Sequence, residues 1–432
     1  MSSSSGQVDV MKFGHTNDIS MDELTIQGPV AQSASDDDTM SPTAPESAAD
    51  DVVTDRARKR RQQHYEKQKA KKKEKRAQKQ AIAATDAPMF EVRDATGKGK
   101  GLFAIRHIPR GSRILSEQAL IACPGFVSNG FVTKAFNALP TDKRSAYMDL
   151  DCKTVLPGEQ NFPEWLRSAL LPARAIIAVF QTNFVVEQTH TLRMTVYLQA
   201  SRLNHSCVPN ALASYNSAVD GQVVHAIRDI EPDEEITISY IQSLEYCRRT
   251  RNNELKQPVE RWFFTCECEA CGTKDRPNET SDAMRERLNK MRMNVYKSMN
   301  RWIEGLRVNV QRLKPMLEKR VEILRSEHLD GTCDFIEAVK YAAWASYITG
   351  DIPKALKYKQ CEKESVLHGF GCDSTLYQRV AAELGRLRRD GPNLTKDAEA
   401  GLKAYMKRSL EEGKRRMLAE QRFVALEGVL EV

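Results

Sequence analysis

Three cysteines stand close together in the run Cys266-Glu-Cys268-Glu-Ala-Cys271. Thiolates at this spacing can bind zinc, but a closed structural zinc site needs a fourth ligand. Cys207 and Cys247 are the nearest candidates in the sequence. Free thiols are the alternative, although clustered and exposed thiols would be reactive. The pattern therefore favours a metal site. The spacing alone does not decide which cysteine is the fourth ligand.

Two polar runs precede these cysteines. The run GKGKG at residues 97–101 sets alternate glycines between two strand-like stretches, and such glycines allow backbone groups to approach a ligand closely. A plain hairpin turn would explain them as well. The run NHSCVPN at residues 204–210 combines amide, imidazole and thiol groups with a proline that fixes a turn. It indicates a ligand-binding loop, or a polar turn with one satisfied histidine.

A tyrosine closes a strand-like pattern, EEITISY, at residues 234–240. A tyrosine at the end of a strand is most often half buried, with its hydroxyl in water. On its own, therefore, Tyr240 indicates a strand end and no particular chemistry.

The sequence predicts that these runs lie on short strands, with a helical segment inserted between them. From Met89 the chain alternates apolar and polar residues between Gly and Pro, which predicts strands joined by tight turns. Longer periodic stretches at about residues 131–200, among them WLRSALLPARAIIAVFQTNFVV, predict inserted helices. Strand patterns then return in ALASYNSA, GQVVHAIRDI and EEITISYI.

A second, all-helical domain is predicted for residues 281–432, where Gly and Pro thin out and the apolar spacing turns helical. Its segment DFIEAVKYAAWASYITGDIPKALKYKQ predicts two helices joined at a Gly-Asp turn. This pair is similar to one tetratricopeptide-type hairpin, and an ordinary helical bundle is the alternative.

The N-terminal region has a sharp charge polarity. Residues 1–55 hold eleven Asp and Glu against Lys12 alone, a net charge of −10, in an acidic, Ser-rich composition that predicts disorder. Residues 56–80 hold thirteen Lys and Arg against two Glu, a net charge of +11. This basic tract predicts a contact with an import receptor or with nucleic acid, or else a solubilising linker.

The composition of the whole chain narrows its class. No stretch approaches the roughly 20 apolar residues of a membrane span, and the polar N-terminus lacks the centre of a signal peptide. Most of the ten cysteines are scattered through 432 residues, which favours reduced thiols over a disulfide framework. We therefore expect a soluble protein without membrane contact, in the nucleus, the cytoplasm or both.

The order of these signals resembles the SET-domain family of lysine methyltransferases. A glycine-rich turn, an insert, NHSC-x-PN, a strand with a terminal tyrosine and C-x-C-x-x-C follow one another over roughly residues 89–273. The cysteine spacing and the helical domain are most similar to the SET-and-MYND branch. The chain lacks the finger of that branch, because only Cys123 and Cys152 lie between the glycine-rich turn and Asn204. In this respect it resembles finger-less, fungal-type SET proteins.

The resemblance implies an α+β fold. It consists of a β-rich SET domain at residues 89–241 with the helical insert, a zinc-binding post-SET cap at residues 242–273, and the α-helical domain.

The resemblance also implies functional residues. S-adenosylmethionine would be contacted by backbone groups of Lys98, Gly99 and Lys100, and its two ends by Asn204 and His205. Further cofactor contacts are implied for Asn183, Tyr240 and Phe264. Tyr240 would be the catalytic tyrosine, with Tyr197 beside it in the lysine channel. The implied zinc ligands are Cys207, Cys266, Cys268 and Cys271.

The implied function is methyl transfer to a lysine of a protein substrate, which would be a histone if the basic tract delivers the chain to the nucleus. The amine would attack the sulfonium methyl in line, so the site must exclude water and favour the uncharged amine. One alternative is a zinc-stabilised SET-fold scaffold without activity, and another is a chromatin- or nucleic-acid-associated protein that depends on residues 56–80. The intact set of Asn204, His205, Tyr240 and cysteines favours the enzyme, because a binding module does not need them.

Overall fold

The structure is a computed structural model that describes residues 88–124, 129–152, 164–188, 192–241, 243–256, 264–390 and 407. All of these residues belong to the unit Ala81–Val432. The predicted acidic segment 1–55 and basic tract 56–80 lie outside the described residues, as does most of the chain beyond Asp390.

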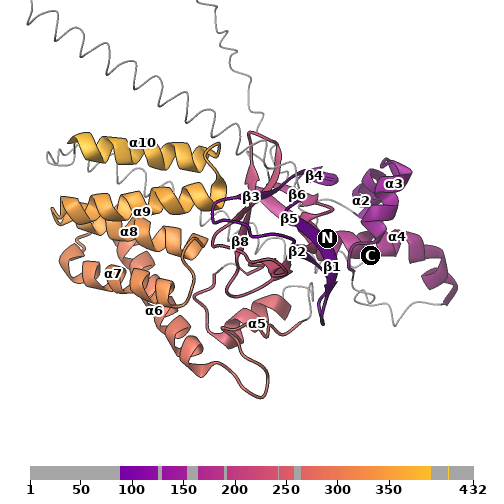
Figure 1. Cartoon of the computed structure of the whole chain (residues 1–432), viewed down its shortest axis with the longest axis horizontal. Coiled ribbons are helices and arrows are strands. Elements are labelled where there is room, and N and C mark those ends of the chain that lie inside the picture. Colours follow the sequence, from indigo (N-terminus) through magenta and orange to yellow (C-terminus); the bar gives the residue numbers. More distant parts are fainter. Residues whose placement is uncertain are drawn as a thin grey trace, which may run out of the picture. The chain divides into compact units, whose positions relative to one another are not determined.

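One small sheet, with strand order β1-β2-β10-β7, carries the two polar runs (Figure 1). Its hairpin of β1 (Phe90–Ala95) and β2 (Gly99–Ala104) turns through Gly97 and Gly99, both at φ +72°. Strand β10 (Glu235–Ile238) pairs antiparallel with β2 and parallel with β7 (Asn204–His205). The sheet thus brings the glycine-rich turn, the NHSC run and the approach to Tyr240 together.

A second sheet forms the body of the domain, in the order β3-β9-β8. Its strands are β3 (Arg113–Gln118), β9 (Gly221–Ala226) and β8 (Ala211–Asn216), and every residue of the central strand β9 is buried. The strands predicted from alternation at these positions are confirmed.

The insert between β3 and β7 contains the helices α2 (Asn129–Asn137), α3 (Thr141–Met148) and α4 (Glu164–Asn183). They pack on a third sheet with the order β4-β6-β5, made of β4 (Ile121–Pro124), β6 (Leu192–Val196) and β5 (Val185–Gln188). Residues 125–128, 153–163 and 189–191 of this region lie outside the described residues.

The predicted helical insert is wrong in its last part, because α4 ends at Asn183 and the chain continues as strands. Val185 and Val186 pair with Thr195 and Met194 of β6. An apolar run such as FVV fits a helix or a strand equally well by periodicity, and its β-branched residues favour the strand once a partner is present.

The helical domain follows the sheets in sequence, and each of its helices packs against the next one. Four of its helices begin at a side chain that accepts a hydrogen bond from the backbone three residues on, and these N-caps are Asn278, Asn309, Thr332 and Asp351. The helices are α6 (Glu279–Ile303), α7 (Val310–Ser326), α8 (Cys333–Ile348), α9 (Ile352–Phe370) and α10 (Thr375–Asp390). The predicted helix pair around Gly350 is confirmed as α8 and α9, and the predicted α+β fold as a whole is confirmed.

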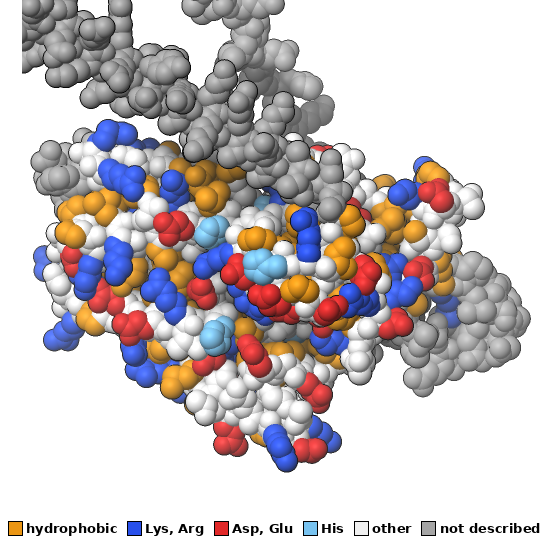
Figure 2. Space-filling view, in the orientation of Figure 1, with side chains coloured by type: hydrophobic (Ala, Val, Ile, Leu, Met, Phe, Trp, Pro, Cys, Tyr) orange, Lys and Arg blue, Asp and Glu red, His pale blue; other side chains and the backbone are white. Residues whose placement is uncertain are grey.

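Helix α9 packs the helical domain against β8 and β9 (Figure 1). The contact is close: a Cβ placed on Gly369 would lie 2.8 Å from a methyl of Leu212 in β8. Basic and acidic side chains are interspersed over the face drawn in Figure 2. None of the described helices combines the length and apolar character that a membrane crossing requires.

Candidate active site and metal centre

The four predicted zinc ligands come together in the structure. The sulfurs of Cys207, Cys266, Cys268 and Cys271, called here the four-cysteine cluster, all lie within 4.8 Å of one another. The Sγ of Cys207 is 3.9 Å from that of Cys266 and 3.6 Å from that of Cys271. Cys247, the other candidate for fourth ligand, instead contacts the hydroxyl of Thr250 at 3.3 Å.

The cluster fits a zinc ion. With Zn–S bonds of about 2.3 Å, the sulfurs of a tetrahedral site lie about 3.8 Å apart, and the observed separations agree with this value. Three of the four cysteines are buried, which suits a closed structural site. A cysteine binds zinc only after its thiol has lost the proton, and four such sulfurs face one another here. The cysteines would therefore hold zinc as thiolates and tie the cap to the NHSC run.

His205 connects the four-cysteine cluster to Tyr240. Its ring is 3% exposed, and burial lowers its pKa to about 4, so the imidazole is neutral. Nδ1 accepts a hydrogen bond from the backbone N–H of Tyr240 at 3.1 Å, which leaves the proton on Nε2, 3.3 Å from the sulfur of Cys207. Both ring nitrogens are thus in use, and a cofactor contact at this position is left to the backbone of His205.

Tyr240 stands two residues beyond β10, at the edge of an aromatic group. Its ring centroid lies 5.5 Å from that of His205 and 6.5 Å from that of Phe264. Its hydroxyl donates a hydrogen bond to the carbonyl of Leu203 at 2.5 Å. A phenol oxygen can accept hydrogen bonds as well as donate one, so the hydroxyl of Tyr240 has the chemistry to orient an amine.

Asn204 holds the glycine-rich turn against β10. Its Nδ2 donates to the carbonyl of Lys100 at 3.2 Å and to Oε1 of Glu235 at 2.7 Å, while Lys98 pairs with the other carboxylate oxygen of Glu235 at 2.7 Å. A Cβ on Gly101 would lie 2.9 Å from Glu235 and 3.0 Å from Asn204. Only glycine permits this close approach, so the third glycine of the run has a structural reason of its own.

Asn183 is connected to the glycine-rich turn by Asp151. Its Nδ2 donates to the carbonyl of Asp151 at 2.7 Å and to that of Val179 at 2.8 Å. The carboxylate of Asp151 lies 3.7 Å from the position of a Cβ on Gly99. The end of α4 is therefore attached beside the glycine-rich turn, which brings the predicted cofactor residues into one connected set.

Tyr197 has a different position from the predicted one in the lysine channel. It is 0% exposed, and its hydroxyl donates to the carboxylate of Glu187 in β5. Glu187 is also paired with Arg193 at 2.8 Å, and burial raises its pKa. The strand β5 that supplies this partner was missed by the sequence, so the pairing that directs Tyr197 into the core could not be foreseen.

Two further polar residues position the NHSC run. Asn210 donates to the carbonyl of Glu235 at 2.8 Å and accepts from the N–H of Thr237 at 2.8 Å, which fixes β10 beside the run. Glu117 accepts four hydrogen bonds from the consecutive backbone N–H groups of residues 198–200. The asparagine closes the motif and could have been selected, whereas Glu117 is a single charged residue in a strand pattern and gives no signal in the sequence.

The segment after Tyr240 is attached to the helical domain. Asp334, in the first turn of α8, accepts from the hydroxyl of Ser243 at 2.9 Å and from the N–H of Leu244 at 2.8 Å. Glu245 binds Arg320 of α7 with both carboxylate oxygens, at 2.7 and 3.0 Å, and both side chains are fully buried. Burial raises the pKa of Glu245 to about 7, and the facing charge of Arg320 opposes this shift.

The comparisons agree with this geometry. The model of the SET domain family matches residues 99–241. Over 297 residues the chain is 25% identical to the protein named "Histone-lysine N-methyltransferase set5" of Schizosaccharomyces pombe, covering 68% of this chain and 83% of that protein.

Two vertebrate relatives match a shorter part. "N-lysine methyltransferase SMYD2" of Homo sapiens is 37% identical over 90 residues, 21% of this chain and 19% of that protein. "Protein-lysine N-trimethyltransferase SMYD5" of Gallus gallus is 38% identical over 94 residues, 21% of this chain and 22% of that protein. The alignments thus span most of the yeast relative and about a fifth of each vertebrate relative.

Proposed function

We propose that this chain, a SET-domain methyltransferase, transfers a methyl group from S-adenosylmethionine to the side-chain amine of a lysine in a protein substrate. The cofactor supplies an electrophilic methyl on a sulfonium. The chain must hold the amine in line with that methyl, keep water away and favour the uncharged amine.

The position of Tyr240 carries this proposal. Its hydroxyl donates its proton to the carbonyl of Leu203, and a phenol oxygen that donates in this way can also accept a hydrogen bond from an amine and orient it. The backbone of Tyr240 is fixed by His205, and Phe264 covers one side with its ring. The enclosure keeps water away, and desolvation beside the cationic sulfonium would lower the pKa of a bound lysine and favour its uncharged amine.

The cofactor would lie along the connected set of predicted residues. Backbone groups of Lys98, Gly99 and Lys100 line the turn, Asn204 and Asn183 are fixed beside it, and Phe264 offers an aromatic face for the adenine. Zinc in the four-cysteine cluster would fix the cap that carries Phe264 against the NHSC run.

We propose a histone lysine as the first substrate to test. The yeast relative, which aligns with 68% of this chain, is named a histone-lysine methyltransferase. The basic tract at residues 56–80 supports delivery to the nucleus or contact with nucleic acid. A non-histone protein lysine is the other substrate class.

The test is transfer of labelled methyl from S-adenosylmethionine to core histones and to a whole-cell protein extract, with Tyr240→Phe alongside. We expect label on lysine and a loss of about 10²-fold or more in the variant, because the amine loses its orienting oxygen. Tyr215→Phe is the matched control. Tyr215 lies on β8, and its hydroxyl donates a hydrogen bond to Asp220 at 2.8 Å and to no residue of the candidate active site. Equal rates in both variants would remove Tyr240 from the chemistry.

A non-catalytic scaffold is the alternative outcome of the same experiment. It predicts no labelled lysine in any extract and no binding of S-adenosylmethionine in calorimetry. Zinc would still be present in that case, so metal content does not decide between the two functions.

A further inference from the structure

Two completely buried arginines flank the four-cysteine cluster. Arg251 belongs to α5 (Arg248–Lys256) and Arg285 to α6, and both are 0% exposed. A buried guanidinium is costly unless an opposite charge and hydrogen bonds compensate for its lost hydration. The partners of the two arginines therefore show what each charge is for.

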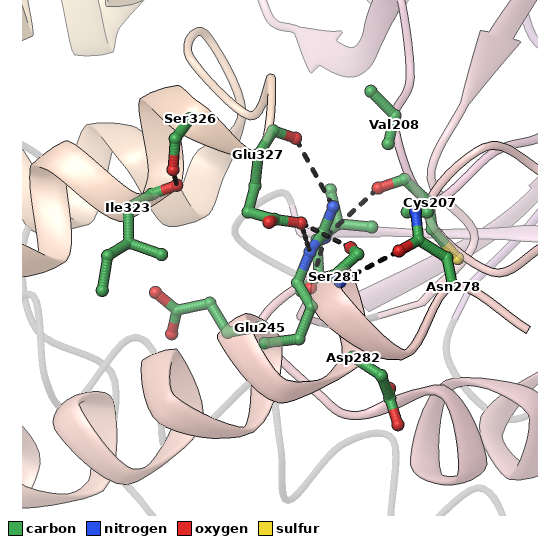
Figure 3. Close-up of polar contacts among 12 residues, drawn as sticks. Cys207, Val208, Glu245, Asn278, Ser281, Asp282, Ile323, Ser326 and Glu327 are labelled. Carbon is green, nitrogen blue, oxygen red and sulfur yellow. Dashed lines mark hydrogen bonds and ion pairs between the residues drawn. The ribbon is translucent and has the colours of Figure 1, made fainter.

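Arg285 has a carboxylate partner. Its Nε lies 3.0 Å from Glu327, while Nη1 donates to the carbonyl of Leu244 at 2.6 Å and to that of Cys207 at 3.4 Å. Figure 3 shows Glu327 and Cys207 on opposite sides of this junction, with Ser281 between them. The charge of Arg285 is balanced within the helical domain, and its contact with the cluster is only to a backbone carbonyl.

Arg251 has no carboxylate within ion-pair distance among the described residues. Its guanidinium donates to the carbonyls of Tyr246 and Ala270, and Nη2 lies 3.4 Å from the sulfur of Cys271. The anionic groups within reach are therefore the cysteine thiolates.

We propose that Arg251 is the counter-ion of a zinc–thiolate centre in the four-cysteine cluster. Four thiols that bind one Zn²⁺ release four protons, which leaves a centre with a net charge of −2 in a buried position. One guanidinium beside Cys271 halves that charge and supplies an N–H to its sulfur. The arginine thus stabilises the loaded centre, and the centre compensates for the burial of the arginine.

The consequence is a zinc ion that leaves slowly. Removal of the metal would leave a buried cation beside protonated thiols, so loss of zinc requires either rearrangement of α5 or retention of a thiolate. The proposal rests on the proposed zinc site and is independent of methyl transfer, so its test reads metal release and not activity.

The experiment uses the full-length, zinc-loaded protein and follows release of zinc to a coloured chelator, after one zinc per chain has been established in the wild type. Arg251→Met removes the charge and the donors, Arg251→Gln removes the charge but keeps an amide donor, and Arg251→Lys keeps the charge without the planar fork. Arg285→Met is the matched control, since it is equally buried but has its own carboxylate.

We expect release at least about 10-fold faster for Arg251→Met and Arg251→Gln, and within about 3-fold of the wild type for Arg251→Lys and Arg285→Met. If Arg251→Met fails to fold, the glutamine and lysine variants decide the question. Wild-type release from Arg251→Gln, or equal acceleration in the glutamine and lysine variants, would overturn the role of the charge. Absence of zinc from the wild type would instead overturn the metal site itself.

Discussion

The two sides of the candidate site are held together in opposite ways. On the side of the glycine-rich turn, Lys98 pairs with Glu235 and Lys100 with Asp149, and both lysine side chains are 43% exposed. On the side of the cap, Glu245 and Arg320 form a pair that is 0% exposed at both partners. Exposed pairs contribute about 0–1 kcal/mol, whereas breaking a buried pair costs about 3–5 kcal/mol.

The difference indicates what each side must do. A turn that receives a ligand through its backbone needs the right path of the chain, and its side-chain charges are secondary. A cap that places Tyr240 and Phe264 needs one arrangement, and buried charges tolerate few others because an unpaired one is so costly. Substitutions on the two sides should therefore differ in their effects on stability and on cofactor binding.

Loss of a zinc ligand should have the largest effect. Cys207→Ser removes a sulfur shared by the cluster and by His205, so we expect zinc content well below one per chain, no methyl transfer and a lowered melting temperature. Metal analysis and a thermal scan measure this. Cys333→Ser, at an exposed position, is the control and should keep its zinc. Full metal content in Cys207→Ser would mean that Cys207 is not a zinc ligand.

Arg320→Met should destabilise the cap side by up to about 3–5 kcal/mol, because the buried Glu245 loses its two-point partner and keeps only the longer ion pair with Arg292, at 3.4 Å. Thermal unfolding measures the loss, and the double variant with Glu245→Gln should recover part of it. Arg312→Met is the matched control, since it lies exposed on the same helix α7. A loss in Arg320→Met as small as that in Arg312→Met would contradict the contrast between the two sides.

Gly101→Ala tests whether the path of the backbone matters on the turn side. The new Cβ would stand within 3.0 Å of both Glu235 and Asn204, so one of them must move, at a cost of about 1–3 kcal/mol. We expect weaker binding of S-adenosylmethionine in calorimetry. Gly97→Ala has open space around its Cβ, although at φ +72° it carries backbone strain. Equal affinity in wild type and Gly101→Ala would separate Asn204 from the cofactor site.

His225 extends the comparison to the contact between β9 and the helical domain. It lies near Arg113 of β3 and Asp373 beyond α9, and burial first, then the charge of Arg113, lowers its pKa to about 4. The unfolded chain, with an ordinary value of about 6.5, binds the proton first on acidification. The stability contributed above pH 6.5 is therefore lost as the pH falls toward 4.

The measurement is the melting temperature between pH 7.5 and 4.5. His225→Gln keeps an acceptor for Arg113 but cannot titrate, so its melting temperature should fall less steeply than that of the wild type over this range. The two proteins should be similar at pH 7.5. Parallel curves would show that other groups carry the acid sensitivity.

The four-cysteine cluster and the polar runs beside it can be recognised in the sequence more readily than the buried residues that hold them in place. Residues of the glycine-rich turn, the NHSC run and the cysteine run are informative through their types and order, because a ligand or a metal requires them locally. Arg251, Arg285 and Arg320 could not be recognised in this way. Each is a charged residue in a helical pattern, where exposure is the default, and only the fold reveals the buried partner.

Strand β5 could not be predicted from the sequence, for a related reason. Val185 and Val186 follow a long apolar helix without a break in hydrophobicity, and their partner β6 is set by tertiary structure. The same strand carries Glu187, which accepts the hydrogen bond of the buried Tyr197 hydroxyl. Local pattern therefore identifies groups that act on a ligand, and it misses those that act through a distant partner.

Lys100→Met should have the smallest effect of the five changes. The lysine contacts Asp149 at 2.8 Å, but its partner is 55% exposed, so the stability of the fold should change by less than about 1 kcal/mol. The implied cofactor contact uses the backbone at this position, and the carbonyl of Lys100 is held by Asn204 whatever the side chain is. We therefore expect an affinity for S-adenosylmethionine within about 3-fold of the wild type, measured by calorimetry at two salt concentrations. A loss as large as that in Gly101→Ala would mean that the lysine charge itself contacts the cofactor, and the turn side would then depend on charge as much as the cap side does.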